Sequence, residues 1–348
     1  MSKDTHEYAS VKLYHLFKKN SGTYIKLGQS LYQSEHILPE PFIRNLEPLC
    51  QEAPKTDFDS VKALIEREFG KKFEEVFEYF EEKPIGSASI AQVHRARLVD
   101  GHQDVAIKIQ HPMISVHCPS DVAITKLATK VGEYLWPGIK LQWISKEFDL
   151  NIYKEIDFTN EARNSEKIKK LFKNDQRIVV PTINWQYTTK KVITMSFEEG
   201  KSIVDVKYRA ENQIKADEVA KLLTDVFYKQ IFRFGFVHAD PHPGNLFIRK
   251  EVVNGKRITR LILLDHGLYR ELDKEFVYNY ALLWRGVFMQ NPDYIKRACY
   301  YFNVTKPELF TSIVVNRNYH EVMNKSVKFD TNKRLGRSGR NKLFLNFL

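Results

Sequence analysis

The order of a polar loop and a short apolar strand in the second half of the chain constrains the fold most strongly. Residues 237–248 read VHADPHPGNLFI, with Asp240 five residues before Asn245. Asp265 lies twenty residues after Asn245, directly after the apolar segment 258–264, and a glycine follows it at position 267. Asp, Asn, Pro and Gly are frequent in turns, so the loop alone is compatible with an ordinary polar turn. A predicted strand that ends directly before Asp265, with a glycine two residues later, favours a functional site over that alternative.

The spacing of these side chains suits the chemistry of phosphoryl transfer. That reaction uses one carboxylate to accept the proton of a hydroxyl group, and an amide oxygen and a second carboxylate to hold a divalent metal on the phosphates. Asp240 has the position of the first carboxylate, and Asn245 and Asp265 have the positions of the metal ligands. A histidine metal site formed by His238 and His242 is the weaker alternative, because prolines interrupt any helix there.

A lysine on a predicted strand can complete such a site. The sequence predicts a hairpin with strands over 89–98 and 105–110, and the second strand contains Val-Ala-Ile-Lys, ending at Lys108. A strand lysine can neutralise the α and β phosphates of a nucleotide when a carboxylate from a neighbouring helix holds it, and Glu161 is the candidate. An isolated VAIK is common by chance, but its position ahead of Asp240 gives it weight.

The segment before this lysine occupies the place of a phosphate-binding loop. It reads GSASIA, and its Ser and Ala side chains restrict the close backbone approach that glycine allows. Taken alone, the segment is an ordinary turn of small residues.

Two further polar motifs, KLGQ and EID, lie on predicted helices. Gly28 inside a helical pattern costs about 1 kcal/mol relative to Ala, which favours close packing at that position. If the helices around Lys26 cover the cleft, this cation requires carboxylates, and Glu155 and Asp157 are the available ones. The alternative for both motifs is that their polar side chains, including Gln29, are solvated on the surface of ordinary helices.

The hydrophobic pattern predicts an α+β fold with two lobes, like that of a protein kinase. Helices are predicted over 8–80, 121–136, 144–173, 216–234 and 269–310, and strands over 89–98, 105–110, 177–180, 192–197 and 258–264. We therefore expect a helical N-terminal extension over residues 1–83, a small lobe over 84–200, a helical large lobe over 201–315 and a basic tail over 316–348.

Charge and cysteine content exclude several other classes of protein. The formal net charge is +11, and residues 316–348 hold eight basic and two acidic side chains, so the rest of the chain is only weakly basic. This argues against a nucleic-acid-binding surface and leaves a solvated tail or contact with an anionic membrane. Three distant cysteines, Cys50, Cys118 and Cys299, fit neither a disulfide framework nor a zinc site and indicate a reducing compartment. No apolar run is long enough to span a bilayer, and any leader of longer relatives is expected to precede residue 1.

The motifs KLGQ, GSASIAQVH, VAIK, EID followed by EA, HADPHPGN and LDHGLY, in this order, resemble the UbiB family of atypical protein-kinase-like proteins. These proteins are also called aarF-domain-containing kinases. The resemblance covers about residues 15–310, and GSASIAQVH and DHGLY are similar to the mitochondrial subgroup one. The chain departs from the family pattern in GSASIA, which usually reads AAASIG, and in DHG, where His266 replaces Phe and is expected to be neutral and buried.

The resemblance implies ATP and Mg²⁺ as cofactors and assigns a role to each motif. It implies that the N-terminal extension folds over the nucleotide cleft, where a protein substrate would otherwise dock. The implied roles are a small-lobe pair of Lys108 and Glu161, a catalytic Asp240, metal ligands Asn245 and Asp265, a nucleotide loop at 86–91, and regulatory residues Lys26, Gln29, Glu155 and Asp157. The nucleotide contacts that the resemblance implies are Gly86, Ser87, Ala88, Ser89, Ile90, Ala91 and Val93, together with Ala106, Lys108, Met195 and Phe197 on the predicted strands.

The resemblance also implies phosphotransferase or ATPase activity in mitochondrial lipid or ubiquinone homeostasis and mitochondrial organisation. A small-molecule or lipid acceptor is then expected rather than a protein. A nucleotide-gated scaffold or lipid-binding regulator with little turnover is the alternative. An ordinary protein kinase is the weakest hypothesis, because residues 269–280 already look helical where an activation loop should run.

Overall fold

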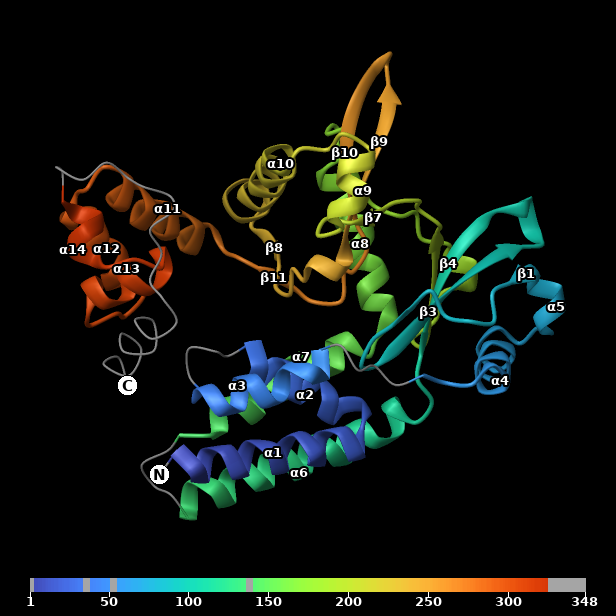
Figure 1. Cartoon of the computed structure of the whole chain (residues 1–348), viewed down its shortest axis with the longest axis horizontal. Helices are drawn as coiled ribbons and strands as arrows, with labels where there is room; N and C mark the ends of the chain where they lie inside the picture. The colour runs from blue at the N-terminus through green and yellow to red at the C-terminus, as the bar shows by residue number, and fades with distance from the viewer. Residues whose placement is uncertain (1–2, 34–37, 51–54, 136–139, 325–348) are drawn as a thin grey trace.

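The small lobe is built on a five-stranded antiparallel sheet, at the right of Figure 1. The computed structural model describes residues 3–33, 38–50, 55–135 and 140–324. Strand order is β1-β3-β4-β6, with β2 paired to β3, and Gly101 turns the chain between β3 and β4 at a φ of +70°. Alternate residues of β4 pack against two helices, which leaves its other face toward the cleft. The elements are α4 (Phe58–Phe69), α5 (Phe73–Val76), β1 (Phe77–Phe80), β2 (Gly86–Ser87), β3 (Ala91–Leu98), β4 (Asp104–Gln110) and β6 (Val192–Ser196).

The prediction of an all-helical segment over residues 8–80 is wrong for β1. This strand pairs with β3, and a register shift between Phe77 and Tyr79 interrupts the pairing. Apolar residues in this segment recur every three or four positions, which is typical of a helix. In the structure, a single helical turn, α5, followed by a strand with a bulge has the same spacing. The rings of Phe73, Phe77 and Phe80 pack on one another in this arrangement. The small-lobe sheet therefore begins before residue 83.

The large lobe contains two further sheets packed against α8 and α10. A four-stranded sheet has the order β5-β10-β9-β7, and β11 pairs with β8. The apolar core between them includes Val226 of α10, Ile248 of β9 and Leu261 of β10. The elements are α8 (Phe158–Leu171), β5 (Ile178–Val179), β7 (Lys201–Ser202), α9 (Val206–Glu211), α10 (Ala216–Tyr228), β8 (Phe236–His238), β9 (Leu246–Val253), β10 (Lys256–Leu263) and β11 (Tyr269–Glu271).

Three sequence predictions for this lobe need correction. The strand β9 was not anticipated, and it makes the large lobe less helical than expected. The helix predicted from Tyr269 begins only at Lys274, because residues 269–271 pair with β8. Strand β5, from within the predicted small lobe, pairs with β10 of the large-lobe sheet.

Four helices at the C-terminal side form a separate apolar cluster, at the left of Figure 1. Its centre includes Leu283, Ile295 and Val322. The last helix lies within the predicted basic tail, and residues 325–348 of that tail lie outside the described residues. The helices are α11 (Lys274–Phe288), α12 (Pro292–Tyr301), α13 (Pro307–Val315) and α14 (Tyr319–Met323).

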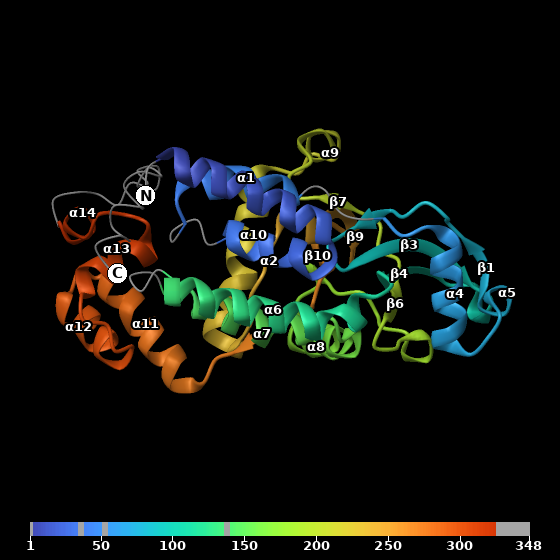
Figure 2. The same ribbon diagram turned by 90° about the horizontal axis from the view of Figure 1, so that it is seen from below.

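A layer of helices lies below both lobes and crosses the middle of the molecule (Figures 1 and 2). We call this layer the helical cover, and define it as α1 (Lys3–Asn20), α2 (Gly22–Gln33), α3 (Glu40–Leu46), α6 (Ile114–Leu135) and α7 (Gln142–Glu155). Helix α2 contacts each of the other four, around a core that includes Phe17, Leu49 and Phe148. The N-terminal extension is thus joined by two helices that the sequence assigns to the small lobe.

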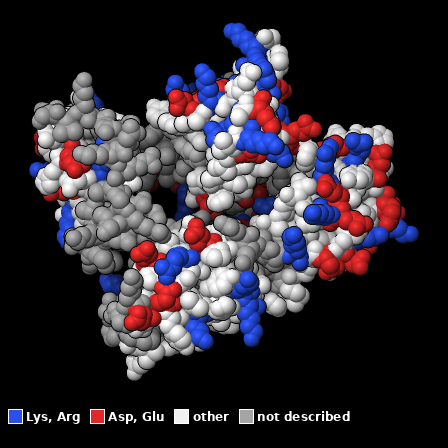
Figure 3. Space-filling model, in the orientation of Figure 1, with Lys and Arg blue, Asp and Glu red and all other residues white. Residues whose placement is uncertain are grey.

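The surface carries charges of both signs. Lys and Arg side chains are interspersed with Asp and Glu on the face shown in Figure 3. In the part of the chain that the structure describes, no helix is both long enough and apolar enough to cross a membrane.

Gly28 lies where α2 packs most tightly inside the helical cover. A Cβ atom at this position would overlap with Cδ1 of Leu49 and lie 2.9 Å from Cδ2 of Phe17. Both neighbours are fully buried, so neither can move away easily. The glycine therefore permits a close approach of apolar side chains to the backbone of α2.

We expect Gly28→Ala to lower the free energy of unfolding by about 1–3 kcal/mol, because overpacking outweighs the better helix propensity of Ala. Urea unfolding measures this change. The control is Gly86→Ala, because a Cβ at residue 86 has no neighbouring atom within 4 Å. An unchanged unfolding midpoint for Gly28→Ala would contradict the packing argument.

Candidate active site

Lys108 and Glu161 form a buried ion pair between β4 and α8. The strand directs Lys108 to the face opposite Ile107 and Ile109, and its Nζ lies 2.9 Å and 2.8 Å from the two carboxylate oxygens of Glu161. The Glu161 side chain is only 2% exposed. Burial opposes the charged form of Lys108, but Asp265 and Glu161 outweigh it and raise its pKa. Burial raises the pKa of Glu161, and Lys108 opposes that effect.

Asp265 lies at the end of β10, beside the same lysine. Its Oδ2 is 3.5 Å from Nζ of Lys108, and its Oδ1 accepts a 2.9 Å hydrogen bond from the backbone N–H of Gly267. Burial favours the neutral acid, but Lys108 and the Gly267 N–H hold the pKa of Asp265 below its usual range. The group is therefore a carboxylate at neutral pH.

Asn245 lies next to this carboxylate because β9 and β10 form an antiparallel hairpin. Leu246 at the start of β9 pairs with Leu263 at the end of β10, and the carbonyl of Asn245 accepts a 3.1 Å hydrogen bond from the N–H of Leu264. An ionised carboxylate and an amide are oxygen donors of the kind that Mg²⁺ prefers. Within the described ranges, no group of three or more His, Cys, Asp and Glu side chains could hold a metal ion.

A second buried ion pair joins the helical cover to the loop that carries Asp240. Nζ of Lys26 lies 2.8 Å from Oε2 of Glu155 and 3.4 Å from Oδ2 of Asp240. The side chains of Lys26 and Glu155 are only 17% and 10% exposed. Burial opposes the charge on Lys26, but the two carboxylates outweigh it and raise its pKa. The structure thus places Lys26, from α2, at the candidate catalytic carboxylate.

Two of the four candidate regulatory residues have other contacts. Asp157 is the N-cap of α8, where its side chain accepts hydrogen bonds from the backbone and hydroxyl of Thr159 at 3.0 Å and 2.6 Å. The expectation that it pairs with Lys26 is therefore wrong, because the chain breaks between α7 and α8. Gln29 of α2 donates a 2.9 Å hydrogen bond to the carbonyl of Leu49, and so links α2 to the segment that follows α3.

The candidate nucleotide loop is held by a histidine that the sequence analysis did not single out. The backbone N–H of His111 donates to the carbonyl of Ile90 at 2.9 Å, and its Nε2 bonds the carbonyl of Ala88 at 3.1 Å. The hydroxyl of Thr56 contacts the other ring nitrogen at 2.7 Å. Since Nε2 donates to a carbonyl, Nδ1 accepts from Thr56. The pairing of residue 111 with the loop has no local sequence signal.

The other candidate nucleotide contacts lie near this loop. Val93 pairs with Lys108, and Ala106 pairs with Met195, in the register of the small-lobe sheet. Met195 packs in a buried cluster with Ile90, Ala91 and Phe158. Phe197 lies further along and stacks under the guanidinium of Arg95 at 4.4 Å. Gly86 and Ser87 form β2, and Ser89 is buried.

His238 links the two candidate catalytic loops. Its Nε2 donates to the backbone carbonyl of Asp265 at 3.0 Å, and its Nδ1 accepts from the backbone N–H of Asp240, also at 3.0 Å. Burial lowers the pKa of this histidine, which keeps it neutral. His242 instead accepts from the N–H of Gly244 at 3.1 Å. In the sequence, the place of His238 two residues before Asp240 could have suggested that this histidine positions the carboxylate.

His266 is held by a polar contact on each side of its ring. Nε2 donates to the carbonyl of Leu263 at 3.0 Å, so Nδ1 is the acceptor of the Tyr269 hydroxyl, also at 3.0 Å. The residue is 2% exposed, and burial lowers its pKa to about 4. The ring is therefore neutral, and together with Tyr269 it fixes the turn that follows Asp265.

We expect Tyr269→Phe to lower the free energy of unfolding by about 1–2 kcal/mol, because Nδ1 of His266 loses its only buried donor among the described contacts. Thermal or urea unfolding measures the loss. Tyr300→Phe, on a side chain that is 87% exposed, serves as the control and should change little. Equal stability of Tyr269→Phe and the wild type would remove the assigned hydrogen bond.

We expect Lys26→Met to cost about 3 kcal/mol of stability, because it leaves Glu155 buried without its cation. The double variant Lys26→Met/Glu155→Leu should recover most of this loss, since both charges are then gone. Lys207→Met is the control, because Lys207 pairs with Glu211 at 4.0 Å on the surface and surface pairs contribute little. Additive effects of the two single substitutions would contradict the pairing.

Most of the chain matches a known protein family. Residues 48–299 match the ABC1 atypical kinase-like domain. The AarF domain-containing kinase 1 of Drosophila melanogaster is 38% identical over 282 residues, 81% of this chain and 54% of the relative, and the mouse protein is 36% identical over 292 residues, 84% and 55%. The chain thus spans about half the length of these curated relatives.

A solved relative has the same fold. The complex of Rv3197 with erythromycin from Mycobacterium tuberculosis superposes with a TM-score of 0.59 at 26% identity, over 85% of this chain and 73% of that protein. The predicted α+β, two-lobed kinase-like fold with an N-terminal helical extension is confirmed. The predicted family resemblance is confirmed as well, and the chain belongs to the ABC1, or AarF, family of atypical kinase-like proteins.

Proposed function

We propose that this chain binds ATP with Mg²⁺ and transfers the γ-phosphoryl group to a small acceptor or to water. The observation that carries the proposal is the position of Lys108, whose ammonium group contacts both Glu161 and Asp265. A lysine in this position can neutralise nucleotide phosphates beside a metal-binding carboxylate. Three separate elements, β4, α8 and β10, must meet for this contact to form.

Each polar residue of the site has a role in this proposal. Lys108 binds the α and β phosphates, and Glu161 holds it in place. Asn245 and Asp265 would hold Mg²⁺, which supplies positive charge for the phosphates. Asp240 accepts the proton of the attacking hydroxyl group, and His238 positions both Asp240 and Asp265 through their backbones.

The nucleotide lies, in this proposal, between the loop at residues 86–91 and the sheet. Val93, Ala106 and Met195 line the face that also presents Lys108. The hydrogen bonds from His111 to the loop limit how far it can open. We therefore expect a narrow nucleotide site, with Phe197 in contact with the nucleotide at its edge.

The acceptor is a small molecule or lipid in this proposal, rather than a protein. Lys26 of helix α2 lies against Asp240, which favours a small acceptor over an extended polypeptide at this carboxylate. The solved relative is in complex with erythromycin, a small molecule, which supports the same class of ligand for this chain. A role in mitochondrial lipid or ubiquinone homeostasis, and a mitochondrial location, rest on membership of the family.

A nucleotide-gated scaffold or lipid-binding regulator is the second candidate function. The contact between Lys26 and Asp240 favours it, because this contact restrains the carboxylate that must accept a proton. ATP hydrolysis measured with and without anionic liposomes separates the two functions. A scaffold binds ATP without turnover under both conditions, whereas an enzyme hydrolyses or transfers it.

We expect Asp265→Asn to abolish Mg²⁺-dependent stabilisation by ATP while the fold is retained, because the variant removes a ligand charge from an open site. A thermal shift assay with ATP, with and without Mg²⁺, measures the effect. Asp59→Asn, on the exposed surface of α4, is the matched control and should respond like the wild type. Unchanged Mg²⁺-dependent stabilisation of Asp265→Asn would refute the assignment.

A further inference from the structure

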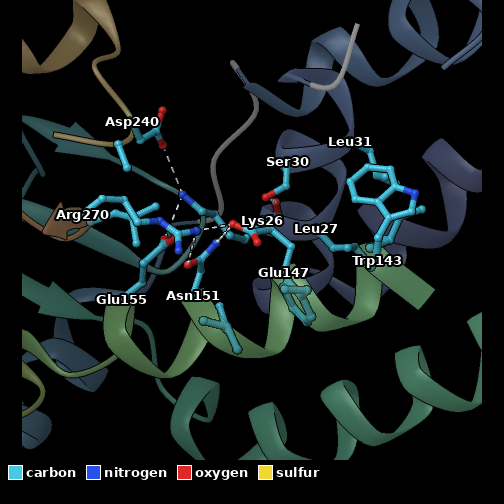
Figure 4. Close-up of a pocket in the computed structure, with 15 residues that line it drawn as sticks. Lys26, Leu27, Ser30, Leu31, Trp143, Glu147, Asn151, Glu155, Asp240 and Arg270 are labelled. Atoms are coloured by element: carbon cyan, nitrogen blue, oxygen red, sulfur yellow. Dashed lines mark hydrogen bonds and ion pairs between the residues drawn. The ribbon is translucent and has the colours of Figure 1, made fainter. Parts of the chain in front are cut away.

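A pocket of about 330 Å³ lies between the helical cover and the loop that carries Asp240 (Figure 4). Helices α2 and α7 form two of its walls, and residues 239, 240, 268 and 270 form the third. The pocket is on the side of Asp240 that faces Lys26, whereas Lys108 and Asp265 belong to the nucleotide side. It therefore lies where an acceptor must come to reach Asp240.

One end of this pocket is polar. Arg270 donates hydrogen bonds to Glu147 and, at 3.4 Å, to Asn151, and Asn151 donates to Glu147 at 2.8 Å. Lys26 bonds Glu155 and Asp240 at the same end, as Figure 4 shows. The charged side chains are thus paired with one another across the wall.

The other end of the pocket is apolar. Leu31 of α2 and Trp143 of α7 lie away from Asp240 in Figure 4. Ile144, next to Trp143 in the sequence, and Phe148, from the next turn of α7, line the pocket as well. A ligand with a polar head and an apolar body therefore matches the two ends of the pocket.

Size and charge narrow the class of this ligand. A volume of about 330 Å³ is at the lower end of small-molecule sites and is too small for a folded protein segment. The wall carries two cations, Lys26 and Arg270, and three anions, Glu147, Glu155 and Asp240. Since the cations are already paired and one negative charge is in excess, an anionic head is disfavoured. A neutral hydroxyl group fits this end.

We propose that this pocket binds a neutral amphipathic alcohol, with its hydroxyl group at Asp240 and its hydrocarbon body between Leu31 and Trp143. This inference rests on the proposed function and names the acceptor class for it. In the transfer step, the hydroxyl oxygen forms a bond to the γ-phosphorus of ATP and the bond from that phosphorus to the β-bridging oxygen breaks. The hydroxyl proton passes to Asp240, and the products are the alkyl phosphate and ADP.

Trp143 provides a direct measurement of binding, because a bromine atom quenches tryptophan fluorescence on contact. The probe is ω-bromoundecanol, a neutral alcohol with bromine at the far end of its chain, added without nucleotide. We expect saturable quenching in the wild type and loss of most of this signal in Trp143→Phe. The carboxylate analogue, ω-bromoundecanoic acid, should bind at least about tenfold more weakly, which corresponds to about 1.4 kcal/mol.

A filling variant tests the location. Ser30 lines the pocket and its hydroxyl bonds the carbonyl four residues earlier, so Ser30→Phe should weaken the alcohol at least about tenfold. Ser120→Phe is the matched control, because Ser120 is an exposed serine on α6 whose hydroxyl also bonds a carbonyl of its own helix. An unaltered thermal unfolding midpoint of Ser30→Phe shows that the variant is folded.

Three outcomes would overturn the proposal: no saturable quenching by the alcohol, quenching that survives Trp143→Phe and Ser30→Phe, or binding of the acid as tightly as the alcohol. Mass spectrometry after incubation with Mg²⁺ and ATP tests the transfer step, and absence of bromoundecyl phosphate from a protein that binds both ligands would exclude the acceptor role. Quenching without any Mg²⁺-dependent stabilisation by ATP would instead retain the pocket and refute the proposed function.

Discussion

Two buried lysines determine how the parts of this molecule come together. Lys108 and Lys26 each lie at most 17% exposed, and a buried charge without a partner costs several kcal/mol. Each lysine therefore requires carboxylates, and these come from other elements: Glu161 and Asp265 for Lys108, Glu155 and Asp240 for Lys26. The first set joins the small lobe to the large lobe, and the second joins the helical cover to the large lobe. The cleft is therefore bounded on two sides by largely buried lysines that are paired with carboxylates.

This arrangement separates the two sides of the candidate reaction. The nucleotide side is defined by Lys108 and Asp265, and the acceptor side by Lys26 and Asp240. The ring of His238 connects the two sides, because it hydrogen-bonds the backbone of both loops. A displacement of one loop would therefore strain its link to the other. The cover leaves a pocket beneath α2 and α7, next to Asp240. In the proposed reaction, access to Asp240 depends on the size and polarity of the ligand, rather than on a binding sequence in a protein substrate.

Sequence reasoning located the parts of the site whose signals are local. Asp240, Asn245 and Asp265 lie in dense motifs, and alternation along β4 was enough to direct Lys108 toward the cleft. The strand β9 was missed because its residues follow a turn-rich loop and alternate only weakly. His111 was missed because its partners, Thr56 and Ala88, are distant in sequence. Assignment of Asp157 to Lys26 failed for another reason: an acidic residue before a helix can be a cap or an ion-pair partner, and the sequence does not distinguish the two.

The break between α7 and α8 explains why one polar segment can serve both lysines. Residues 155 and 161 are six positions apart, and on a continuous helix their side chains would point about 120° apart in projection, toward different surroundings. In the structure, α7 ends at Glu155, and Asp157 caps a new helix that begins at Phe158. Each glutamate can then be directed independently, Glu155 toward the cover and Glu161 toward β4. The single helix predicted over residues 144–173 is thus two helices, and the cap between them allows one stretch of chain to bind both Lys26 and Lys108.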